Sequence, residues 1–259
     1  MTEQPTTVNT VADGIARITW IPDVGEGGWV AAVDVVRREV EAALAGHARV
    51  EALVDPDDEH AQRVATWSGM RKEGVMRGVT VDGTTVDRIV YARLATDAPA
   101  HEPEGFRALL NSFLPRKRAI SQMLIRDSDG RVLVCQLTYK QDWDLPGGVV
   151  EVGESPQLAV AREVEEELGI TVEPGALLLT DWLPPWSGWD DALCLVFDGG
   201  SHEASLVERI TKQDREIRAA EFCAIEAVRE RCADFTARRI ESALANLASG
   251  GPSYTEGGG

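Results

Sequence analysis

The sequence predicts an α/β protein built from two domains, and three observations lead to this prediction. The chain has 259 residues, 44% of them hydrophobic, which suffices for two cores of ordinary size. Runs with the alternating pattern of strands follow runs with the amphipathic pattern of helices along most of the chain. A stretch rich in alanine and proline, residues 96–103, separates two such series and has the composition of a linker.

The first series predicts a partial α/β domain at residues 11–95, preceded by ten residues that are expected to be disordered. Its expected strands lie at residues 15–21, 49–54, 73–79 and 87–94, and its expected helices at residues 29–45 and from about 55 to 69. Such a partial sheet has an open edge. We expect the second domain, or a second subunit in a homodimer, to cover it.

The second series predicts a further α/β domain at residues 116–248, after a linker at 96–115 that contains a short helix, GFRALLNSFL. Its expected strands lie at residues 119–126, 132–137, 171–182, 192–197 and 216–225, and a closing helix is expected at 226–247. The triplet RKR at 116–118 is interpreted as surface charge. The tail SGGPSYTEGGG, residues 249–259, has low complexity and is expected to be disordered.

The stretch GVVEVGESPQLAVAREVEEELGI at 148–170 carries the strongest functional signal. Ser155 and Pro156 suit the start of a helix, and Gly169 suits its end, so a helix is expected at 156–168. At about 100° per residue, the three glutamates at 163, 166 and 167 share one face of this helix. Carboxylates at such short distances repel one another unless a cation such as Mg²⁺ lies among them. The alternative interpretation is a solvated acidic surface.

The spacing of this stretch resembles the signature of the Nudix hydrolases, G-x5-E-x7-R-E-U-x-E-E-x-G-U, where U is a bulky aliphatic residue. The preceding WDLPGG is also similar to that family. The resemblance implies an α/β/α sandwich around a mixed sheet at about 116–248, with Mg²⁺ as cofactor and Mn²⁺ as a substitute. The implied metal ligands are Glu163, Glu166, Glu167 and the carbonyl of Gly147.

The same stretch provides the remaining candidate catalytic residues. Glu163 or Glu167 is expected to orient or deprotonate the attacking water as well. Glu154 and Arg162 are expected to hold the loop and the helix in place through charge-assisted hydrogen bonds. A further acid from outside the stretch is expected to join the metal cluster, and the sequence leaves four candidates open: Asp190, Asp191, Glu216 and Glu221.

Three residues are candidates for substrate binding. Gly148, beside Gly147, lets the backbone approach a ligand closely. Trp186 and Trp189 lie in a loop with Trp182, and flat indole rings can stack on a nucleobase. The alternative for these two tryptophans is that they clamp a proline-rich loop against the sheet. Trp182 is expected to pack in the core.

The first domain resembles the C-terminal half of a GNAT acetyltransferase, and the resemblance is clearest in the stretch VEALVDPDDEHAQRVATWSGMRKEGVMRG. In that family a glycine-rich loop with a basic residue binds the pyrophosphate of acetyl-CoA. Here the loop carries Glu26, with Asp23 beside it, and a carboxylate repels pyrophosphate. The first domain is therefore expected not to be catalytic, and to serve structure, oligomerisation or substrate gating.

Composition excludes several classes of protein. The formal net charge of −17 disfavours binding to DNA or RNA. No apolar run is long enough for a membrane span, and the first residues lack a signal-peptide pattern, so a cytoplasmic location is expected. The four cysteines, at positions 135, 194, 223 and 232, form no C-x-x-C pair and are expected to be reduced and buried.

The predicted function is Mg²⁺-dependent hydrolysis of a diphosphate bond in a nucleoside diphosphate linked to another moiety, such as a nucleotide sugar or ADP-ribose. The substrate is thus a small phosphorylated nucleotide. Two alternatives remain open: a nucleoside triphosphate pyrophosphohydrolase acting on damaged nucleotides, and a non-catalytic sensor of a nucleotide ligand. A working acetyltransferase is the weakest hypothesis.

Overall fold

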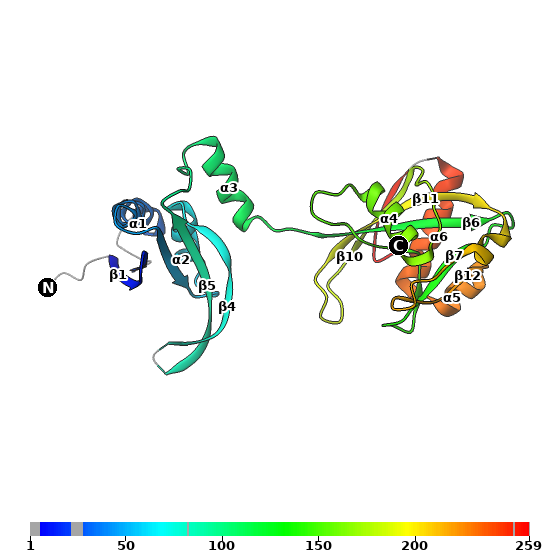
Figure 1. The fold of residues 1–259 in the computed structure, drawn as a ribbon, viewed down its shortest axis with the longest axis horizontal. Helices are drawn as coiled ribbons and strands as arrows, with labels where there is room; N and C mark the ends of the chain where they lie inside the picture. Colours follow the sequence, from blue (N-terminus) through cyan, green and yellow to red (C-terminus); the bar gives the residue numbers. More distant parts are fainter. Residues whose placement is uncertain (1–5, 22–27, 82, 251, 259) are drawn as a thin grey trace. The chain divides into compact units, whose positions relative to one another are not determined.

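The chain divides into two compact units, Met1–Pro115 and Arg116–Gly259 (Figure 1). The computed structural model describes residues 6–21, 28–81, 83–250 and 252–258. Asp23 and Glu26, on which the prediction about the pyrophosphate loop depends, lie outside these residues. Within the described residues, no helix is both long enough and apolar enough to cross a membrane.

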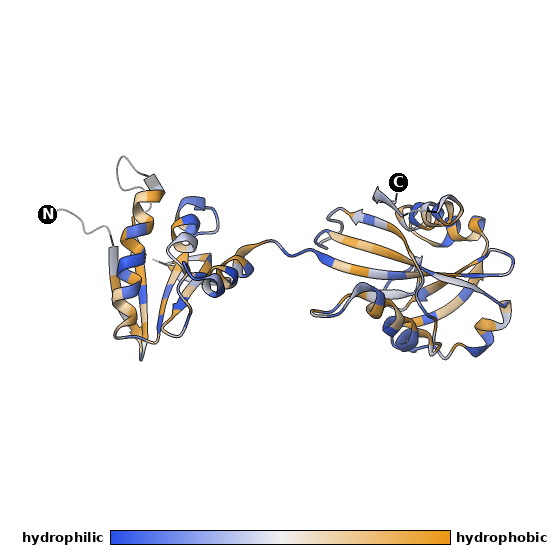
Figure 2. Ribbon diagram, turned by 90° about the horizontal axis from the view of Figure 1, so that it is seen from above, coloured by the Kyte–Doolittle hydropathy of each residue, from blue (hydrophilic) through white to orange (hydrophobic). Residues whose placement is uncertain are grey.

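The first unit is a five-stranded sheet with helices. Its strands are β1 (Thr6–Ala12), β2 (Ile15–Trp20), β3 (Arg49–Val54), β4 (Arg71–Val81) and β5 (Thr84–Leu94). Its helices are α1 (Gly28–Leu44), α2 (Glu59–Trp67) and α3 (Pro103–Phe113). The strand order is β1-β2-β3-β5-β4, in which β2 and β3 are parallel and the other pairs antiparallel. Apolar residues of α1 and α2 form one core with the sheet, and in Figure 2 hydrophobic colour follows the strands.

Two predictions about the ends of this unit are corrected. Residues 6–10 were expected to be disordered, but they form most of β1, which pairs with β2 and is an edge strand of the sheet. The expected linker also contributes to the unit through α3. Its Ser112 hydroxyl accepts the backbone N–H of Lys72 at 3.2 Å, and Leu109 is buried. Phe113 packs edge-on against Trp67, with ring centroids 6.3 Å apart.

The second unit is built around a mixed sheet. Its strands are β6 (Arg118–Asp127), β7 (Val132–Leu137), β8 (Trp143–Asp144), β9 (Gly147–Val149), β10 (Leu177–Leu183), β11 (Ala192–His202), β12 (Ile217–Cys223) and β13 (Ser253–Glu256). Its helices are α4 (Pro156–Leu168), α5 (Ile225–Arg231) and α6 (Asp234–Ser249), with a 3₁₀ helix at Ala204–Arg209. The main order is β12-β7-β6-β11-β10-β13, while β8 pairs with β7 and β9 with β6. The pairs β6–β11 and β10–β13 are parallel.

Helices cover both faces of this sheet. Alternate residues of β6 point to opposite faces, because successive side chains of a strand alternate. Met123 and Ile125 pack in the cluster that contains the apolar side of α4, and Leu124 packs in the cluster that contains α5 and α6. This arrangement confirms the predicted α/β/α sandwich with a mixed sheet.

Three predicted segments of the second unit were wrong in part. Residues 171–176 do not form a strand, because Pro174 and Gly175 interrupt the extended run before β10. The closing helix is two helices, which are broken at Cys232, whose extended backbone bridges to Trp143. The tail is not disordered over residues 252–258, since β13 pairs with β10 and Gly258 makes a buried contact with Asp181.

Candidate active site

Helix α4 begins and ends at the residues that its local signals predict. The Ser155 hydroxyl accepts the N–H of Leu158 at 3.3 Å, and Pro156 occupies the first turn, where its missing N–H costs nothing. Gly169 ends the helix in the left-handed conformation, with φ at 64°. Val164 and Leu168 anchor the helix in the core. The glutamates of α4 are therefore fixed relative to the sheet.

Glu167 is buried, with only 5% of the residue exposed. One of its carboxylate oxygens accepts the backbone N–H of Gly147 at 3.0 Å, which ties α4 to the glycine loop of β9. Desolvation raises the pKa of Glu167 to about 8, and the nearby charges of Glu163 and Glu216 add to the rise. A cation among these carboxylates would relieve the cost of burying them.

Glu163 lies against Gly148. A Cβ atom at position 148 would stand 2.5 Å from the Glu163 carboxyl carbon, so only glycine leaves this carboxylate its place. Burial also raises the pKa of Glu163. The sequence pattern assigned Gly148 to ligand approach, and the structure gives it a further role in making room for Glu163.

Arg162 brings three glutamates together. Its guanidinium lies 2.9 Å from Glu154, 2.9 Å from Glu163 and 3.0 Å from Glu166, measured between nitrogen and carboxylate oxygen. The hydrogen bond to Glu154 is the main reason that the pKa of Arg162 is raised and that of Glu154 is lowered. Glu154 precedes α4, so this contact joins the loop to the helix.

The donor set fits a hard divalent cation in its chemistry. Glu163, Glu166 and Glu167 offer carboxylate oxygens, which Mg²⁺ prefers, and two of them are half-buried or buried. Within the described residues, however, no three acidic, histidine or cysteine side chains are already gathered as a metal cluster. Arg162 is the ion-pair partner of both Glu163 and Glu166 in this structure. The metal-ligand roles, including that of the Gly147 carbonyl, remain predictions.

The two tryptophans predicted to bind substrate lie at the tip of the β10–β11 hairpin. Trp186 and Trp189 are 63% and 61% exposed, and their backbones exchange two hydrogen bonds. The ring of Trp186 lies 6.0 Å from that of Phe235 on α6, and the Arg118 guanidinium lies 4.9 Å above Trp189. Both indoles thus keep open surface, so stacking on a ligand stays a prediction. Trp182, expected in the core, is half-buried.

The four candidate acids from outside the helix lie in different surroundings. Asp190 is exposed, and its backbone carbonyl accepts a hydrogen bond from Arg118 at 2.9 Å. Asp191 pairs with Lys117 and accepts the indole N–H of Trp182. Glu221 pairs with Arg231 at 2.6 Å. The charge of Glu216 instead raises the pKa of both Glu163 and Glu167, so Glu216 is near enough to interact electrostatically with these two carboxylates of α4.

A buried polar network, which the sequence did not predict, connects the approach to this site with α6. Asp144, three residues before Gly147, pairs with Lys140 at 2.7 Å and accepts the Gln122 amide at 2.8 Å. Arg239 donates to Gln122 at 3.1 Å and to the fully buried Asp181 at 2.8 Å. The available signal was an arginine among the apolar residues of an amphipathic helix.

The glutamates that α4 holds against the glycine loop are a carboxylate donor set of the kind that suits a metal-dependent hydrolase. The NUDIX domain family matches residues 115–244. The chain therefore belongs to the NUDIX family, and its second unit is a domain of the Nudix hydrolase type.

Individual relatives match shorter parts of the chain. A MutT-like protein of Streptomyces ambofaciens is 46% identical over 55 residues, which are 21% of this chain and 35% of that protein. The nucleoside triphosphatase NudI of Escherichia coli O1:K1 is 37% identical over 93 residues, or 34% of this chain and 61% of that protein. The chain thus spans between a third and two thirds of the length of these relatives.

A solved structure of a MutT protein from Methanosarcina mazei Go1 is 25% identical, with a TM-score of 0.43. The similarity covers 54% of this chain and 99% of that one.

Proposed function

We propose that the second unit hydrolyses a phosphoric anhydride bond in a small nucleotide, with Mg²⁺ as the metal ion. The first candidate substrate is a nucleoside diphosphate linked to another moiety, such as a nucleotide sugar or ADP-ribose. The observation that carries the proposal is the placement of Glu163 and Glu167, two buried or half-buried carboxylates, against Gly148 and Gly147. Burying carboxylates costs desolvation energy. Side chains placed in this way are therefore typical of functional sites, where they act as metal ligands or bases.

The contacts of each residue suggest its role in the proposed reaction. Bound Mg²⁺ would neutralise the charge of the diphosphate and stabilise the leaving group. Glu163, Glu166 and Glu167 would hold it. Either Glu163 or Glu167 would also accept the proton of the attacking water. Arg162 and Glu154 keep the loop and the helix in register.

A second candidate is the hydrolysis of nucleoside triphosphates to monophosphate and pyrophosphate, including damaged nucleotides. The similarity to the nucleoside triphosphatase NudI favours it. Both candidates use the same carboxylates and differ in what lies beyond the diphosphate. The exposed rings of Trp186 and Trp189 offer stacking surfaces for a base in either case.

The test is product analysis with Mg²⁺ on nucleotide sugars, ADP-ribose, dinucleotides and nucleoside triphosphates. The matched blank is Glu166→Gln, whose side chain is 58% exposed, so its loss leaves the core intact. We expect turnover of one class and a loss of at least about a hundredfold in the variant, the size of effect typical for a residue that acts on the transition state. Ligands that raise the melting temperature without any turnover would favour the sensor over the hydrolase.

We further infer that residues 11–95 are a partial GNAT-like domain without acetyltransferase activity. What supports this is the order of strand, helix, strand, helix and two strands from β2 to β5, which matches the order expected from the resemblance. Titration of the full chain with acetyl-CoA is the test. We expect no binding at millimolar concentration, and tight binding would contradict the inference.

A further inference from the structure

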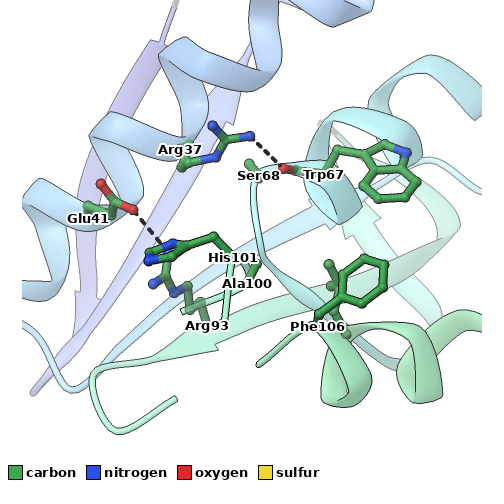
Figure 3. Close-up of a pocket in the computed structure, with 9 residues that line it drawn as sticks. Arg37, Glu41, Trp67, Ser68, Arg93, Ala100, His101 and Phe106 are labelled. Carbon is green, nitrogen blue, oxygen red and sulfur yellow. Dashed lines mark hydrogen bonds and ion pairs between the residues drawn. The ribbon is translucent and has the colours of Figure 1, made fainter. Parts of the chain in front are cut away.

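The first unit contains a pocket of about 250 Å³ that none of the functions above uses (Figure 3). It lies between α1, the end of α2, β5 and the segment that leads into α3. Its lining combines two arginines with aromatic rings, and it consists of Arg37, Glu41, Trp67, Ser68, Arg93, Ala100, His101, Phe106 and Leu109. This volume is just below the range typical of drug-sized ligands, so a smaller metabolite fits it.

Arg93 is the buried cation of the pocket. Its side chain is only 10% exposed, and its Nη1 lies 3.5 Å from the nearer carboxylate oxygen of Glu41, which is itself 52% exposed. Charge-assisted hydrogen bonds are normally about 2.7–2.9 Å long. The pair is therefore loose, and the Arg93 guanidinium, which carries five N–H donors, lines the pocket.

Arg37 adds a second guanidinium to the same pocket. It reaches over the pocket from α1 and donates to the carbonyl of Trp67 at 3.1 Å, while its other terminal nitrogen pairs with the exposed Asp34. Among the lining residues, two arginines thus face one glutamate. With histidine neutral, the lining carries a formal charge of +1 in a chain whose net charge is −17. Asp34 balances this charge, but both carboxylate partners, Asp34 and Glu41, are exposed and screened by water, so the donors of the two arginines remain suited to an anion.

The side of the pocket away from Glu41 is aromatic (Figure 3). Trp67 and Phe106 remain 42% and 44% exposed, although both are large hydrophobic residues beside a buried core. Their rings offer apolar surface to a flat group that enters between them. The guanidinium groups are placed to receive a carboxylate or phosphate on the same molecule, for which planar arginine forks are suited.

We propose that this pocket binds a small organic anion that carries one carboxylate or phosphate group on a flat apolar body. The oxyanion binds Arg93 and Arg37, and in doing so it displaces Glu41 from its loose contact. The apolar body lies against Trp67 and Phe106. The site belongs wholly to the first unit and does not depend on the hydrolase chemistry of the second.

The test uses the full chain without divalent metal and four probes: phenyl phosphate, benzoate, inorganic phosphate and the neutral benzyl alcohol. Calorimetry measures the affinity, and the indole N–H resonance of Trp67, assigned with Trp67→Phe, reports the place of binding. We expect phenyl phosphate or benzoate to bind at least about tenfold more tightly than benzyl alcohol and to shift this resonance. The better of the two anions identifies the oxyanion, and binding of inorganic phosphate alone, as tight as either, would contradict the aromatic part of the site.

Three variants separate a binding site from a structural ion pair. Arg37→Gln should weaken binding about tenfold, the effect of losing one charge-assisted hydrogen bond. Arg38→Gln is the matched control, because Arg38 is the next residue of α1, bonds to the Asp34 carbonyl and does not line the pocket. Glu41→Gln should tighten binding severalfold, since it removes the competing carboxylate.

Replacing the buried Arg93 would also affect folding, so a loss of binding in its variant would not distinguish a binding role from a structural one. The test therefore uses Arg37 and Glu41, which are more exposed. Equal affinity in Arg37→Gln and Arg38→Gln would overturn the proposal. Weaker binding in Glu41→Gln, or equal binding of benzyl alcohol, would overturn it as well.

Discussion

The two neighbouring glycines of the active-site loop differ in what a side chain would meet. A Cβ atom at Gly147 would stand 2.2 Å from the backbone carbonyl oxygen of Ser121, and its φ of 135° disfavours other residues. A Cβ atom at Gly148 would meet the carboxyl end of Glu163. Because a backbone cannot step aside and a flexible side chain can, the first glycine is needed for folding and the second for the position of Glu163.

Gly148→Ala is therefore expected to fold and to lose activity. We expect a melting temperature within a few degrees of the wild type and turnover at least about tenfold lower, because the displaced Glu163 no longer lies at the reacting centre. Gly147→Ala should instead destabilise the fold by about 2–4 kcal/mol. Gly46→Ala, which has open space around it, is the control. Wild-type turnover of Gly148→Ala would show that the place of Glu163 is unimportant.

Asp144 is expected to make the unfolding free energy depend on pH in the acid range. Desolvation raises the pKa of its carboxyl, but the charges of Lys140 and Arg239 outweigh this and hold the pKa below the ordinary 3.8. A depressed folded-state pKa contributes stability above the unfolded-state value, and this stability is lost as the pH falls through the folded-state value. The contribution of Asp144 should thus be complete at neutral pH and disappear below about pH 4.

Asp144→Asn is expected to lose about 1–3 kcal/mol of unfolding free energy at pH 7, because Lys140 and Gln122 lose a charged hydrogen-bond acceptor. Its unfolding free energy should also fall less steeply than that of the wild type below about pH 4. Urea titrations across this range measure both. Asp142→Asn, at an exposed position two residues away, is the control. Parallel acid profiles for wild type and Asp144→Asn would contradict this assignment.

At the scale of elements, local signals explain which segments the sequence predicted well. Helix α4 starts and stops where Ser155, Pro156 and Gly169 predict, because caps act within one turn. The break between α5 and α6 has no glycine or proline, and it follows from the pairing of Cys232 with Trp143, a residue far away in sequence. Strand β13 likewise depends on a partner strand that its own composition does not reveal.

The same distinction holds for the candidate site. The spacing of Glu163, Glu166 and Glu167 along the chain is enough to predict that they share one face of a helix. Their surroundings were not predictable, since Gly147 and Gly148 reach the helix only through the pairing of β9 with β6. The burial of Glu167 is a tertiary property of this kind, and no pattern within the helix indicates it.

A buried carboxylate, that of Asp181, binds the segment around strand β13, and the contribution of this contact to the unfolding free energy can be measured. Asp181 is fully buried, and one of its oxygens accepts the Thr255 hydroxyl at 2.8 Å and the Gly258 N–H at 2.9 Å. We expect Thr255→Val to lower the unfolding free energy by about 1–2 kcal/mol, because it removes a donor from a buried charge. Urea titration measures the change.

The neighbouring residue provides the matched control for this prediction. Tyr254 is 59% exposed, and its hydroxyl bonds to Glu256 at the surface. Tyr254→Phe should stay within about 0.5 kcal/mol of the wild type. Equal losses of unfolding free energy in both variants would contradict the prediction. They would mean that the hydrogen bond from Thr255 to Asp181 adds nothing to stability beyond the packing of the strand.

At the scale of the whole molecule, each unit has a hydrophobic core of its own. The core of the first unit is made of residues between Ala16 and Tyr91. The two cores of the second unit are made of residues between Met123 and Ala243. Since no buried cluster among the described residues draws on both units, each has what a domain needs to fold alone.

Residues 116–259 expressed alone are therefore expected to fold and to unfold in one cooperative transition. Their kcat/KM for the substrate identified by product analysis should stay within about threefold of the full chain, because every candidate catalytic residue lies in this unit. Calorimetry and steady-state kinetics measure the two quantities. A fall of about tenfold or more in kcat/KM at an unchanged melting temperature would contradict this expectation, and would show that the first unit gates the substrate. The anion probes would then become candidate effectors, since occupancy of a site in the first unit would have a route to the rate of the second.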